Sequence, residues 1–320
     1  MAIVDMPLDK LRDYRGTNPK PDDFDEFWNE SVAQIRTIDP AFELIRADFQ
    51  TPGIECFDMF YSSAKGARIH AKLCKPKKIS GKLPALLKFH GYSGSAGDWA
   101  DLLGYAGCGF IIAAMDCRGQ GGLSQDVNPV DGYTYDGHII RGLQNSPENL
   151  LFRDIYLDTA MLAKIVLDMP ETDSERLGAF GGSQGGGLTL ACAALEPRVS
   201  RIAPIFPFLC DYQRVWSLDL ETKAYDEIKQ YFRRFDPLHK KETEVFTKLG
   251  YIDCYHLSEK IKAKTLMFVG LRDTICPPSS IFAAYNNIKA DKKLEIFPDF
   301  GHENLPTAAD MTFQHFLQWG

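Results

Sequence analysis

The sequence predicts one α/β domain with a mostly parallel central sheet and helices on both faces. Apolar strand-like runs alternate with helix-like segments along most of the 320 residues. The chain is 45% hydrophobic, and no low-complexity linker divides it. A chain of this length and composition can bury one full core. Strand–helix alternation is typical of a parallel sheet that helices cover on both sides.

The N-terminal part adds two elements to this core. Residues 1–40 are polar and predict a helical extension, with a helix from about 22 to 36. The segment 56–75 alternates apolar and polar residues, which predicts a hairpin that turns at 65–66. We expect the helix to dock on the body through an apolar face that consists of Phe24, Phe27 and Trp28.

The rest of the chain supplies the sheet and its helices. The strands are expected near 84–89, 110–115, 176–180, 201–206, 264–269 and 293–297. Helices are expected at 185–195 and at about 306–319. An amphipathic helix at 150–167 is expected to point Phe152, Ile155, Tyr156, Met161 and Ile165 towards the core. The charged, aromatic segment 211–256 interrupts the alternation and predicts a helical insertion that covers the site and selects the substrate.

A serine motif lies between a predicted strand and a predicted helix. The sequence Gly-Gly-Ser-Gln-Gly occupies 181–185, after the apolar run 176–180. A serine in this context is typical of a nucleophile elbow, a sharp turn that lifts the hydroxyl clear of the sheet. Glycines at 181 and 185 allow the neighbouring backbone to approach closely. The competing interpretation is a glycine-rich turn with a solvent-exposed serine, and partners downstream disfavour it.

A histidine far downstream is the candidate base for this serine. A serine hydroxyl needs a base within hydrogen-bond reach to act as a nucleophile. Among seven histidines, His302 follows the strand-like run 293–298 and precedes the final predicted helix. His138 and His256 stay open as alternatives. The others are expected to be structural, namely His70, His90, His239 and His315.

The candidate acid is Asp273, which follows the apolar run 265–270. A carboxylate there can hold the imidazole in the right tautomer and stabilise its protonated form. Asp299 and Asp253 are rival acids, but Asp299 is only three residues before His302. The chain order serine, aspartate, histidine is that of the α/β-hydrolase fold. The order therefore predicts this fold with Ser183, Asp273 and His302 as its catalytic triad.

The oxyanion hole is predicted at the end of another strand. His-Gly-Tyr-Ser-Gly follows the predicted strand 83–89 and occupies 90–94. The second donor of an α/β-hydrolase comes from this loop, and the first follows the nucleophile. We therefore assign the oxyanion hole to the backbone N–H groups of Tyr92 and Gln184. The nearby Arg118 is expected to form buried ion pairs that hold the loops around the site.

With these residues in place, the chain resembles the cephalosporin C deacetylase and acetyl xylan esterase family over nearly its whole length. The signature blocks are Arg-Gly-Gln at 118–120, Gly-Gly-Ser-Gln-Gly-Gly-Gly at 181–187 and His-Glu at 302–303. Pro-Phe-Leu-Cys at 207–210 and Asp-Thr-Ile-Cys-Pro-Pro-Ser at 273–279 are also similar. The resemblance implies the same triad and the same donors, Tyr92 and Gln184. It also implies that the Tyr92 ring and Pro207 bind substrate on the acyl side.

The resemblance further implies an activity and an assembly. Members are serine esterases that remove acetyl groups from small acetylated substrates, such as xylo-oligosaccharides, sugars and cephalosporin C, through an acetyl-enzyme. They form disc-like hexamers with active sites facing an internal cavity. In this chain the N-terminal helix and the hairpin near 65–66 are additions that can supply subunit contacts or simply cap the monomer.

Composition restricts the partners and the compartment. A net charge of −7 and a pI near 5.6 argue against nucleic-acid and anionic-membrane partners. The start of the chain has no signal-peptide pattern, and no apolar run has membrane-spanning length. The eight cysteines form no Cys-x-x-Cys pair and predict buried free thiols in the cytoplasm, including Cys108, Cys192 and Cys210. No spacing indicates a metal site, and no cofactor is expected.

Other functions share the predicted fold. The alternatives are a general short-chain carboxylesterase, a peptidase of the prolyl oligopeptidase type and a non-catalytic binding protein. Such peptidases carry a separate propeller domain, for which 320 residues leave no room. A binding protein on this fold would normally lose a triad member, whereas this sequence has all three.

Overall fold

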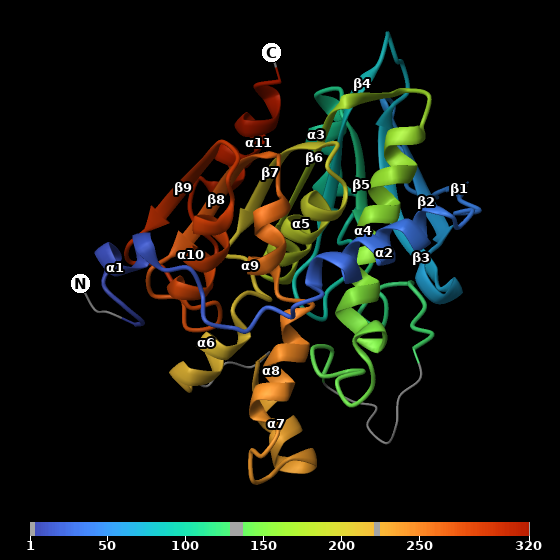
Figure 1. The fold of residues 1–320 in the computed structure, drawn as a ribbon. Helices are drawn as coiled ribbons and strands as arrows, with labels where there is room; N and C mark the ends of the chain where they lie inside the picture. Colours follow the sequence, from blue (N-terminus) through green and yellow to red (C-terminus); the bar gives the residue numbers. More distant parts are fainter. Residues whose placement is uncertain (1–3, 129–136, 221–224, 320) are drawn as a thin grey trace.

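The computed structural model describes residues 4–128, 137–220 and 225–319, which form a nine-stranded sheet flanked by helices (Figure 1). The strand order is β1-β2-β3-β5-β4-β6-β7-β8-β9. The pairs β1–β2, β2–β3 and β3–β5 are antiparallel, and all pairs from β5 to β9 are parallel. The prediction of a mostly parallel α/β sheet is confirmed. The strands are β1 (Glu43–Arg46), β2 (Ile54–Ser62), β3 (Arg68–Pro76), β4 (Leu83–Phe89), β5 (Ile111–Met115), β6 (Thr172–Gly182), β7 (Val199–Ile205), β8 (Lys264–Gly270) and β9 (Lys292–Phe297).

The strands match the predicted runs, with one addition. All six strands expected from 84 onwards are present as β4 to β9. The predicted hairpin is β2–β3, which closes through a 3₁₀ turn, η1 (Ala64–Gly66), where Lys65 has a φ of 57°. The sequence did not predict β1, a four-residue strand at the edge of the sheet. Three of its four residues are exposed, so it lacks the apolar alternation that marks a strand.

Helices connect the parallel strands and precede the sheet (Figure 1). Four of them, α6 to α9, lie between β7 and β8, and α6, α7 and α8 gather at the lower end of the molecule in this view. The helices are α1 (Leu8–Asp13), α2 (Phe24–Arg36), α3 (Ala100–Gly107), α4 (Leu151–Asp168), α5 (Gln184–Leu195), α6 (Tyr212–Leu218), α7 (Asp226–Phe235), α8 (Glu242–Gly250), α9 (Cys254–Leu257), α10 (Pro278–Asn287) and α11 (Ala308–Leu317). Short 3₁₀ turns are η2 (Pro147–Asn149) and η3 (Ser258–Lys260).

The two faces of the sheet are covered by different helices. Side chains alternate along a strand, so neighbouring residues of β4 enter different cores. Ala85 and Leu87 belong to the larger core with α4 and α5, whereas Leu86 belongs to a smaller core with α3 and α11. On the smaller side, the ring centroids of Tyr105 in α3 and Phe313 in α11 lie 4.7 Å apart. The sheet is therefore sandwiched between helices, as predicted.

The five residues of α4 that were predicted to point towards the core are all buried, but the burial of the helix extends beyond the predicted amphipathic face. Nearly all of its residues are buried, including the charged Arg153 and Asp158. The reason is that α2 lies over the face that would otherwise meet solvent. Arg153 donates to the Ser31 hydroxyl at 3.0 Å, and the Trp28 and Tyr156 rings stack with centroids 6.0 Å apart. Polar residues such as Arg153 in α4 therefore mark buried hydrogen bonds, whereas Lys164 and Asp168 near its C-terminus form an exposed pair.

The aromatic face of the N-terminal helix docks on the body, as predicted. Phe24, Phe27 and Trp28 of α2 are 0%, 7% and 1% exposed. The Trp28 indole donates to the Tyr251 carbonyl at 2.8 Å, which ties α2 to the segment after α8. Because these rings are buried within the chain, they are not free to contact another subunit.

All eight cysteines are free thiols, and seven are buried. Burial was predicted for Cys108 as well, and that prediction is wrong. Cys108 is the C-cap residue of α3, where the chain turns outward before β5, so its side chain is exposed despite its apolar neighbours. Among the described residues, no helix combines the length and apolarity that crossing a bilayer requires.

Candidate active site

Ser183 lies at the sharp turn between β6 and α5. Its backbone has φ 57° and ψ −121°, a conformation that costs a non-glycine residue roughly 1–3 kcal/mol. The surrounding backbone fixes this turn. The Ser183 N–H donates to the Ile205 carbonyl at 3.0 Å, and the Phe208 N–H donates to the Ser183 carbonyl at 3.0 Å. The predicted strand–turn–helix context is present, and it is held by the loop that follows β7.

The two glycines that flank Ser183 are required by the end of β4. A Cβ atom on Gly181 would lie 2.4 Å from the Phe89 carbonyl oxygen, and one on Gly185 would lie 2.1 Å from the same atom. Both distances are shorter than any real Cβ contact, and the neighbour is backbone that cannot rotate away. The elbow therefore packs directly on the loop that begins after Phe89, where the oxyanion donor was predicted.

The three predicted triad side chains form one chain of hydrogen bonds. The His302 Nε2 atom lies 3.0 Å from the Ser183 Oγ atom. The His302 Nδ1 atom lies 2.8 Å from the Asp273 Oδ2 atom. Asp273 is fully buried, whereas the His302 side chain is 21% exposed. In this arrangement Nδ1 carries the proton that Asp273 accepts, which leaves the Nε2 lone pair directed at the serine hydroxyl.

The Asp273 carboxylate is held in place by its own turn. Its second oxygen, Oδ1, accepts the backbone N–H groups of Ile275 and Cys276, both at 2.8 Å. These two donors fix the plane of the carboxylate, so that the other oxygen faces His302. Because both oxygens of the Asp273 carboxylate are hydrogen-bonded, the buried group keeps one defined orientation.

The loops that carry the acid and the base are tied together. The Arg272 N–H donates to the Phe300 carbonyl at 2.9 Å. A Cβ atom on Gly270 would lie 2.5 Å from the same carbonyl oxygen, so only glycine permits this approach. The ring of Phe206 lies against His302 with centroids 4.6 Å apart. His302 is therefore positioned from the acid side and from the β7 side.

His90 has the structural role that the sequence predicted. Its Nδ1 atom donates to the Gly91 carbonyl at 2.7 Å, and its Nε2 atom accepts the Cys117 N–H at 3.0 Å. Burial lowers the pKa of His90, which favours the neutral ring that these two hydrogen bonds need. His90 thus ties the loop 90–94 to the segment that follows β5.

Gln120 links the two predicted oxyanion donors. Its side-chain oxygen accepts the Ser93 N–H at 2.9 Å, next to Tyr92. The amide groups of Gln120 and Gln184 also contact each other, at 2.8 and 3.0 Å. Gln184 is fully buried. The Gln120 side chain therefore fixes the loop that contains Tyr92 relative to the helix that begins at Gln184.

Tyr92 and Pro207, the residues predicted on the acyl side, both lie beside the elbow. The Tyr92 hydroxyl donates to the Glu227 carboxylate of α7 at 2.6 Å, which fixes the far end of the ring. The rings of Tyr92 and Phe208 meet edge to face with centroids 5.8 Å apart. Pro207 packs on Gly186, because a Cβ atom there would lie 2.9 Å from its Cα atom. We call Tyr92, Pro207 and Phe208 the acyl wall.

The rival acid and base candidates make other contacts. Asp253 is buried and accepts the N–H groups of Asp211 at 2.8 Å and Tyr255 at 3.1 Å, so it caps α9. Asp299 is exposed on a turn. The His256 ring packs on Phe24 and Tyr255, and burial lowers its pKa to about 4. His138 packs against the ring of Tyr92, with centroids 5.0 Å apart, and its backbone N–H donates to the Tyr92 hydroxyl.

Ion pairs of the buried Arg118 and His70 support the segment after β5. The fully buried Arg118 donates to both oxygens of Asp158 at 2.6 and 2.7 Å, as predicted for loop support. His70 lies between Asp116 and Asp58, with contacts of 2.6 and 3.0 Å. Burial alone would lower the pKa of His70, but these hydrogen bonds outweigh it and the pKa is raised.

Cys276 is an unpredicted neighbour of the triad. It is fully buried and follows Asp273 by three residues. Burial raises the pKa of its thiol and the charge of Asp273 adds to the effect, so the thiol is protonated at neutral pH. One ligand atom from each of Asp273, Cys276 and His302 lies within 4.8 Å of the other two.

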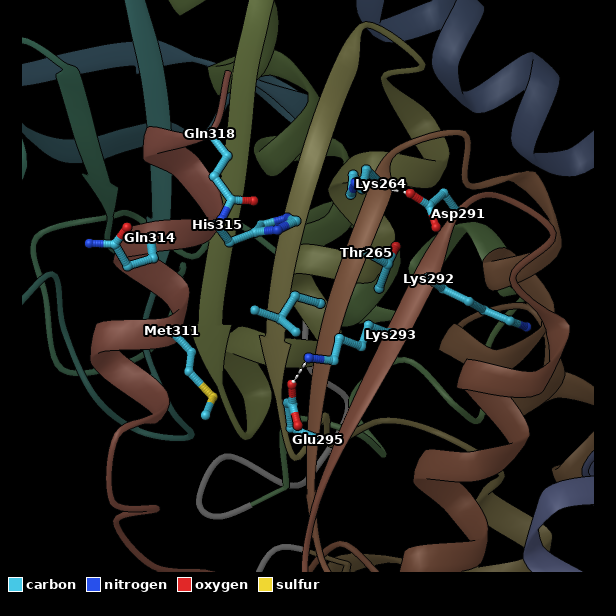
Figure 2. Close-up of a pocket in the computed structure, with 11 residues that line it drawn as sticks. Lys264, Thr265, Asp291, Lys292, Lys293, Glu295, Met311, Gln314, His315 and Gln318 are labelled. Carbon is cyan, nitrogen blue, oxygen red and sulfur yellow. Dashed lines mark ion pairs between the residues drawn. The ribbon is translucent and has the colours of Figure 1, made fainter. Parts of the chain in front are cut away.

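A separate cavity of about 410 Å³ lies at the other end of the strands (Figure 2). It is lined by the first residues of β8 and β9 and by α11, whereas Asp273 follows the last residue of β8, roughly 20 Å away. Two of its three lysines are paired with acids, Lys264 with Asp291 at 3.0 Å and Lys293 with Glu295 at 2.6 Å. The third, Lys292, donates to backbone carbonyls. None of the triad residues lines it.

The sequence did not reveal three residues that position the site, namely Gln120, Glu227 and Cys276. Gln120 and Cys276 lie inside the motifs at 118–120 and 273–279. The motifs indicate that both residues are near the site, but they assign neither of them a role. Glu227 lies in a charged helix and meets Tyr92, 135 residues away, only in the folded chain.

Comparisons with known proteins identify the family of the chain. The family model for acetyl xylan esterase (AXE1) matches residues 1–319. The crystal structure of acetyl xylan esterase 1 from Thermoanaerobacterium sp. JW/SL YS485 is 56% identical, with a TM-score of 0.96, and the match covers 98% of this chain and 99% of that one. The acetyl xylan esterase from Paenibacillus sp. R4 is 36% identical, with a TM-score of 0.93 and the same coverage of each chain.

Two more distant relatives also match the chain. Acetyl esterase Axe7A from Xylanibacter ruminicola is 26% identical over 284 residues, which cover 87% of this chain but only 62% of that protein. The acylaminoacyl peptidase from Pyrococcus horikoshii is 16% identical, with a TM-score of 0.57, over 83% of this chain and 40% of that one, a likeness that shows the fold alone. With its full-length family match and its two close structural relatives, the chain belongs to the acetyl xylan esterase family, a family of carboxylic ester hydrolases with the α/β-hydrolase fold.

Proposed function

We propose that this protein is a serine esterase that removes acetyl groups from small acetylated saccharides, with acetylated xylo-oligosaccharides as the principal class. The observation that supports this most is the unbroken hydrogen-bond chain from Ser183 through His302 to Asp273, in a chain of the acetyl xylan esterase family. By the same chemistry, the acetyl ester of cephalosporin C is a second substrate.

In the first step, the Ser183 Oγ atom attacks the acetyl carbonyl carbon. The His302 Nε2 atom takes the serine proton, and Asp273 stabilises the resulting imidazolium through Nδ1–H. The carbonyl electron pair moves to oxygen. When the tetrahedral intermediate collapses, the sugar oxygen leaves with the proton from Nε2 and an acetyl-enzyme remains. Water then attacks this ester, His302 again serves as the base, and acetate departs.

The developing oxyanion is bound by the N–H groups of Tyr92 and Gln184. Each donor of this kind lowers the barrier by about 3–4 kcal/mol. Gln120 supports this assignment, because it joins the loop of one donor to the side chain of the other. The N–H of Gln184 also begins α5, so the positive end of the helix dipole favours negative charge at this point.

The acyl wall limits the length of the acyl group. The Tyr92 ring cannot swing away easily, because its hydroxyl is bound to Glu227, which is itself only 6% exposed. Pro207 and Phe208 follow β7 on a loop where Phe206 and Leu209 have φ angles of 32° and 68°. Such strained residues persist only where the surrounding structure fixes them. A fixed wall accepts acetyl and excludes longer chains.

The segment 211–256 is proposed to be a helical cap that selects the substrate, within a single domain of residues 1–320. Its helix α7 contributes Glu227, which contacts Tyr92 and also accepts the Ile140 N–H at 3.1 Å. The extension 1–40 holds the cap from the other side. The Tyr14 hydroxyl donates to Asp211 at 2.6 Å, and the Asn18 N–H donates to the same carboxylate at 2.9 Å.

We further propose that the protein forms a homohexamer and that it is located in the cytoplasm. The aromatic face of α2 is already buried, so the contacts must come from other surfaces. The edge of the sheet at β1 supports this idea, because Phe42, Ile45 and Phe49 are 39–50% exposed there. Eight free thiols fit a reducing compartment. Light scattering tests the assembly, and a monomer mass at micromolar concentration would exclude it.

The decisive experiment compares wild-type protein with Ser183→Ala on acetylated xylo-oligosaccharides, polymeric acetyl xylan and cephalosporin C. We expect acetate release by the wild type, fastest per acetyl group on the oligosaccharides. Ser183→Ala should lower kcat about 10⁶-fold, with its circular dichroism unchanged. Substantial turnover by a pure Ser183→Ala sample would refute the mechanism. A preference for long acyl esters would indicate a general carboxylesterase, and cleavage of peptide bonds would indicate a peptidase.

A further inference from the structure

Three side chains at the proposed active site are typical metal ligands of three kinds. Asp273 offers a carboxylate oxygen, Cys276 a sulfur and His302 a ring nitrogen, and these atoms all lie within 4.8 Å of one another. Within residues 4–128, 137–220 and 225–319, this is the only such group of three. Zn²⁺ is bound in proteins by each of these three kinds of ligand, carboxylate oxygen, cysteine sulfur and histidine nitrogen.

We propose that Asp273, Cys276 and His302 form an inhibitory site for Zn²⁺ and similar borderline-soft divalent cations. The site uses the triad residues themselves, with Cys276 as the ligand that ordinary serine hydrolysis does not need. The effect on turnover rests on the proposed esterase function, whereas binding of the cation does not. The expected state is one Zn²⁺ per chain, bound reversibly.

The distances are close to those of a zinc site. Zinc bonds of roughly 2.0–2.3 Å in a tetrahedron place ligand atoms about 3.3–3.8 Å apart. A separation at the upper limit of 4.8 Å therefore needs to close by about 1 Å. The His302 Nδ1 and Asp273 Oδ2 atoms, 2.8 Å apart, need to separate by about 0.5 Å if both bind the cation. Asp273 and Cys276 belong to one turn, in which the Cys276 N–H donates to the Asp273 carboxylate at 2.8 Å. Two ligands are thus preorganised.

The third ligand, His302, lies on the side from which a cation can enter the site. His302 is 21% exposed, whereas the other two side chains are fully buried. Its loop is held at a fixed distance from the acid turn by the hydrogen bond from the Arg272 N–H to the Phe300 carbonyl, at 2.9 Å. Because the loops are held, the imidazole reaches a cation by rotating, which breaks its present hydrogen bonds with Asp273 and Ser183. Water or the Ser183 hydroxyl can supply the fourth ligand.

The charges balance when the cation binds. The Cys276 thiol releases its proton to solvent and becomes a thiolate. Zn²⁺ then faces one thiolate and one carboxylate, so the buried group is neutral, whereas Asp273 alone leaves a buried negative charge. The imidazole lone pair is donated to the metal. It can no longer accept the Ser183 proton, and turnover stops.

Binding is measured without catalysis, on the Ser183→Ala variant and on wild-type protein, with Co²⁺ as a spectroscopic substitute for Zn²⁺. We expect visible absorption typical of four-coordinate Co²⁺ and a near-ultraviolet thiolate-to-cobalt band, both lost when Zn²⁺ is added. Calorimetry with Zn²⁺ should give one site per chain. A cobalt complex without the thiolate band would overturn the proposal, because Cys276 would then not be a ligand.

Inhibition is measured on wild type, Cys276→Ser and Cys108→Ser, each relative to its own rate without metal. Outer-shell changes weaken metal sites about 10–100-fold, and loss of a direct ligand should weaken inhibition at least as much in Cys276→Ser. Cys108→Ser removes the exposed thiol and should match wild type. EDTA should restore the rate. Equal zinc sensitivity of Cys276→Ser and wild type would refute the site.

The two proposals fail in different ways. If wild-type protein shows the thiolate–cobalt band but hydrolyses no acetyl ester, the metal site stands and the esterase proposal is wrong. If acetate release is fast but the band is absent, only the metal site is wrong. Should Cys276→Ser not fold, the wild-type cobalt spectrum still decides, because the other seven thiols have no partner set of this kind among the described residues.

Discussion

Replacement of Asp273 by asparagine tests the proposed triad most directly, because the structure dictates how the new side chain must lie. The Asp273 Oδ1 atom accepts two N–H groups at 2.8 Å, from Ile275 and Cys276. In Asp273→Asn the carbonyl oxygen stays there, and the amide NH₂ group faces His302. The amide then donates to Nδ1, which forces the proton onto Nε2. In that tautomer Nε2 cannot accept the serine proton.

The size of the expected loss in kcat depends on how much free energy the opposite orientation of the asparagine amide costs. Turning the amide over restores the tautomer but places NH₂ against two N–H groups and leaves them unsatisfied. At about 1–3 kcal/mol for each group, this costs at least about 2 kcal/mol. Fewer than roughly one molecule in thirty would then have the productive orientation. Loss of the charge that stabilises the imidazolium adds to this, and the expected total is about 10⁴-fold in kcat, or about 5 kcal/mol.

The assay is kcat/KM on p-nitrophenyl acetate, with Asp299→Asn as the matched control. Asp299 is exposed and lies three residues before His302, so this variant removes a nearby charge without touching the hydrogen-bond chain. It should stay within a few-fold of wild type. The Tm of Asp273→Asn should shift by only a few degrees, because the same N–H groups remain bonded. The reasoning fails if Asp273→Asn keeps more than a tenth of the activity, or if Asp299→Asn is the worse variant.

Three further predictions concern packing, acyl selectivity and pH. Gly185→Ala should lower the unfolding free energy by more than about 4 kcal/mol, because its Cβ atom would lie 2.1 Å from the Phe89 carbonyl oxygen; Gly53→Ala, with nothing within 4 Å, is the control in chemical denaturation. From acetyl to butyryl p-nitrophenyl esters, kcat/KM should fall about tenfold or more for each methylene; a flat series would argue against the acyl wall. His70, whose pKa is raised, contributes stability that is complete below pH 6.5 and is lost as the pH rises through the raised value. His70→Gln should flatten this loss in urea unfolding measured across that range, and an unchanged slope would contradict the assignment.

The positions of the strands from 84 onwards and the residues of the proposed triad could be predicted because each depends on local patterns. Apolar runs in the parallel part of the sheet identify β4 to β9, and Ser183, Asp273 and His302 each follow such a run. The hydrogen bonds among these three side chains agree with the prediction of a triad. Their catalytic roles stay a prediction until the variants are measured.

The residues that the sequence did not reveal depend on approach in three dimensions. Glu227 and Tyr92 meet across 135 residues, and no periodicity in a charged helix indicates such a contact. The burial of α4 on nearly all sides was missed because α2, which covers it, comes from the N-terminal extension. Cys108 was expected to be buried from its apolar neighbours, but its position at the end of α3 decides its exposure.

The contact between the N-terminal extension and the α6–α9 segment has a consequence for how the protein can be shortened or fused. Tyr14 and Asn18 bind Asp211, and Trp28 binds the Tyr251 carbonyl, so the first thirty residues anchor helices encoded two hundred residues later. A gene that begins near residue 40 would still encode the parallel strands and Ser183, but it would remove this anchor and uncover the face of α4 that α2 covers. The loss would then affect substrate selectivity and substrate affinity before it affects the rate of the chemical step.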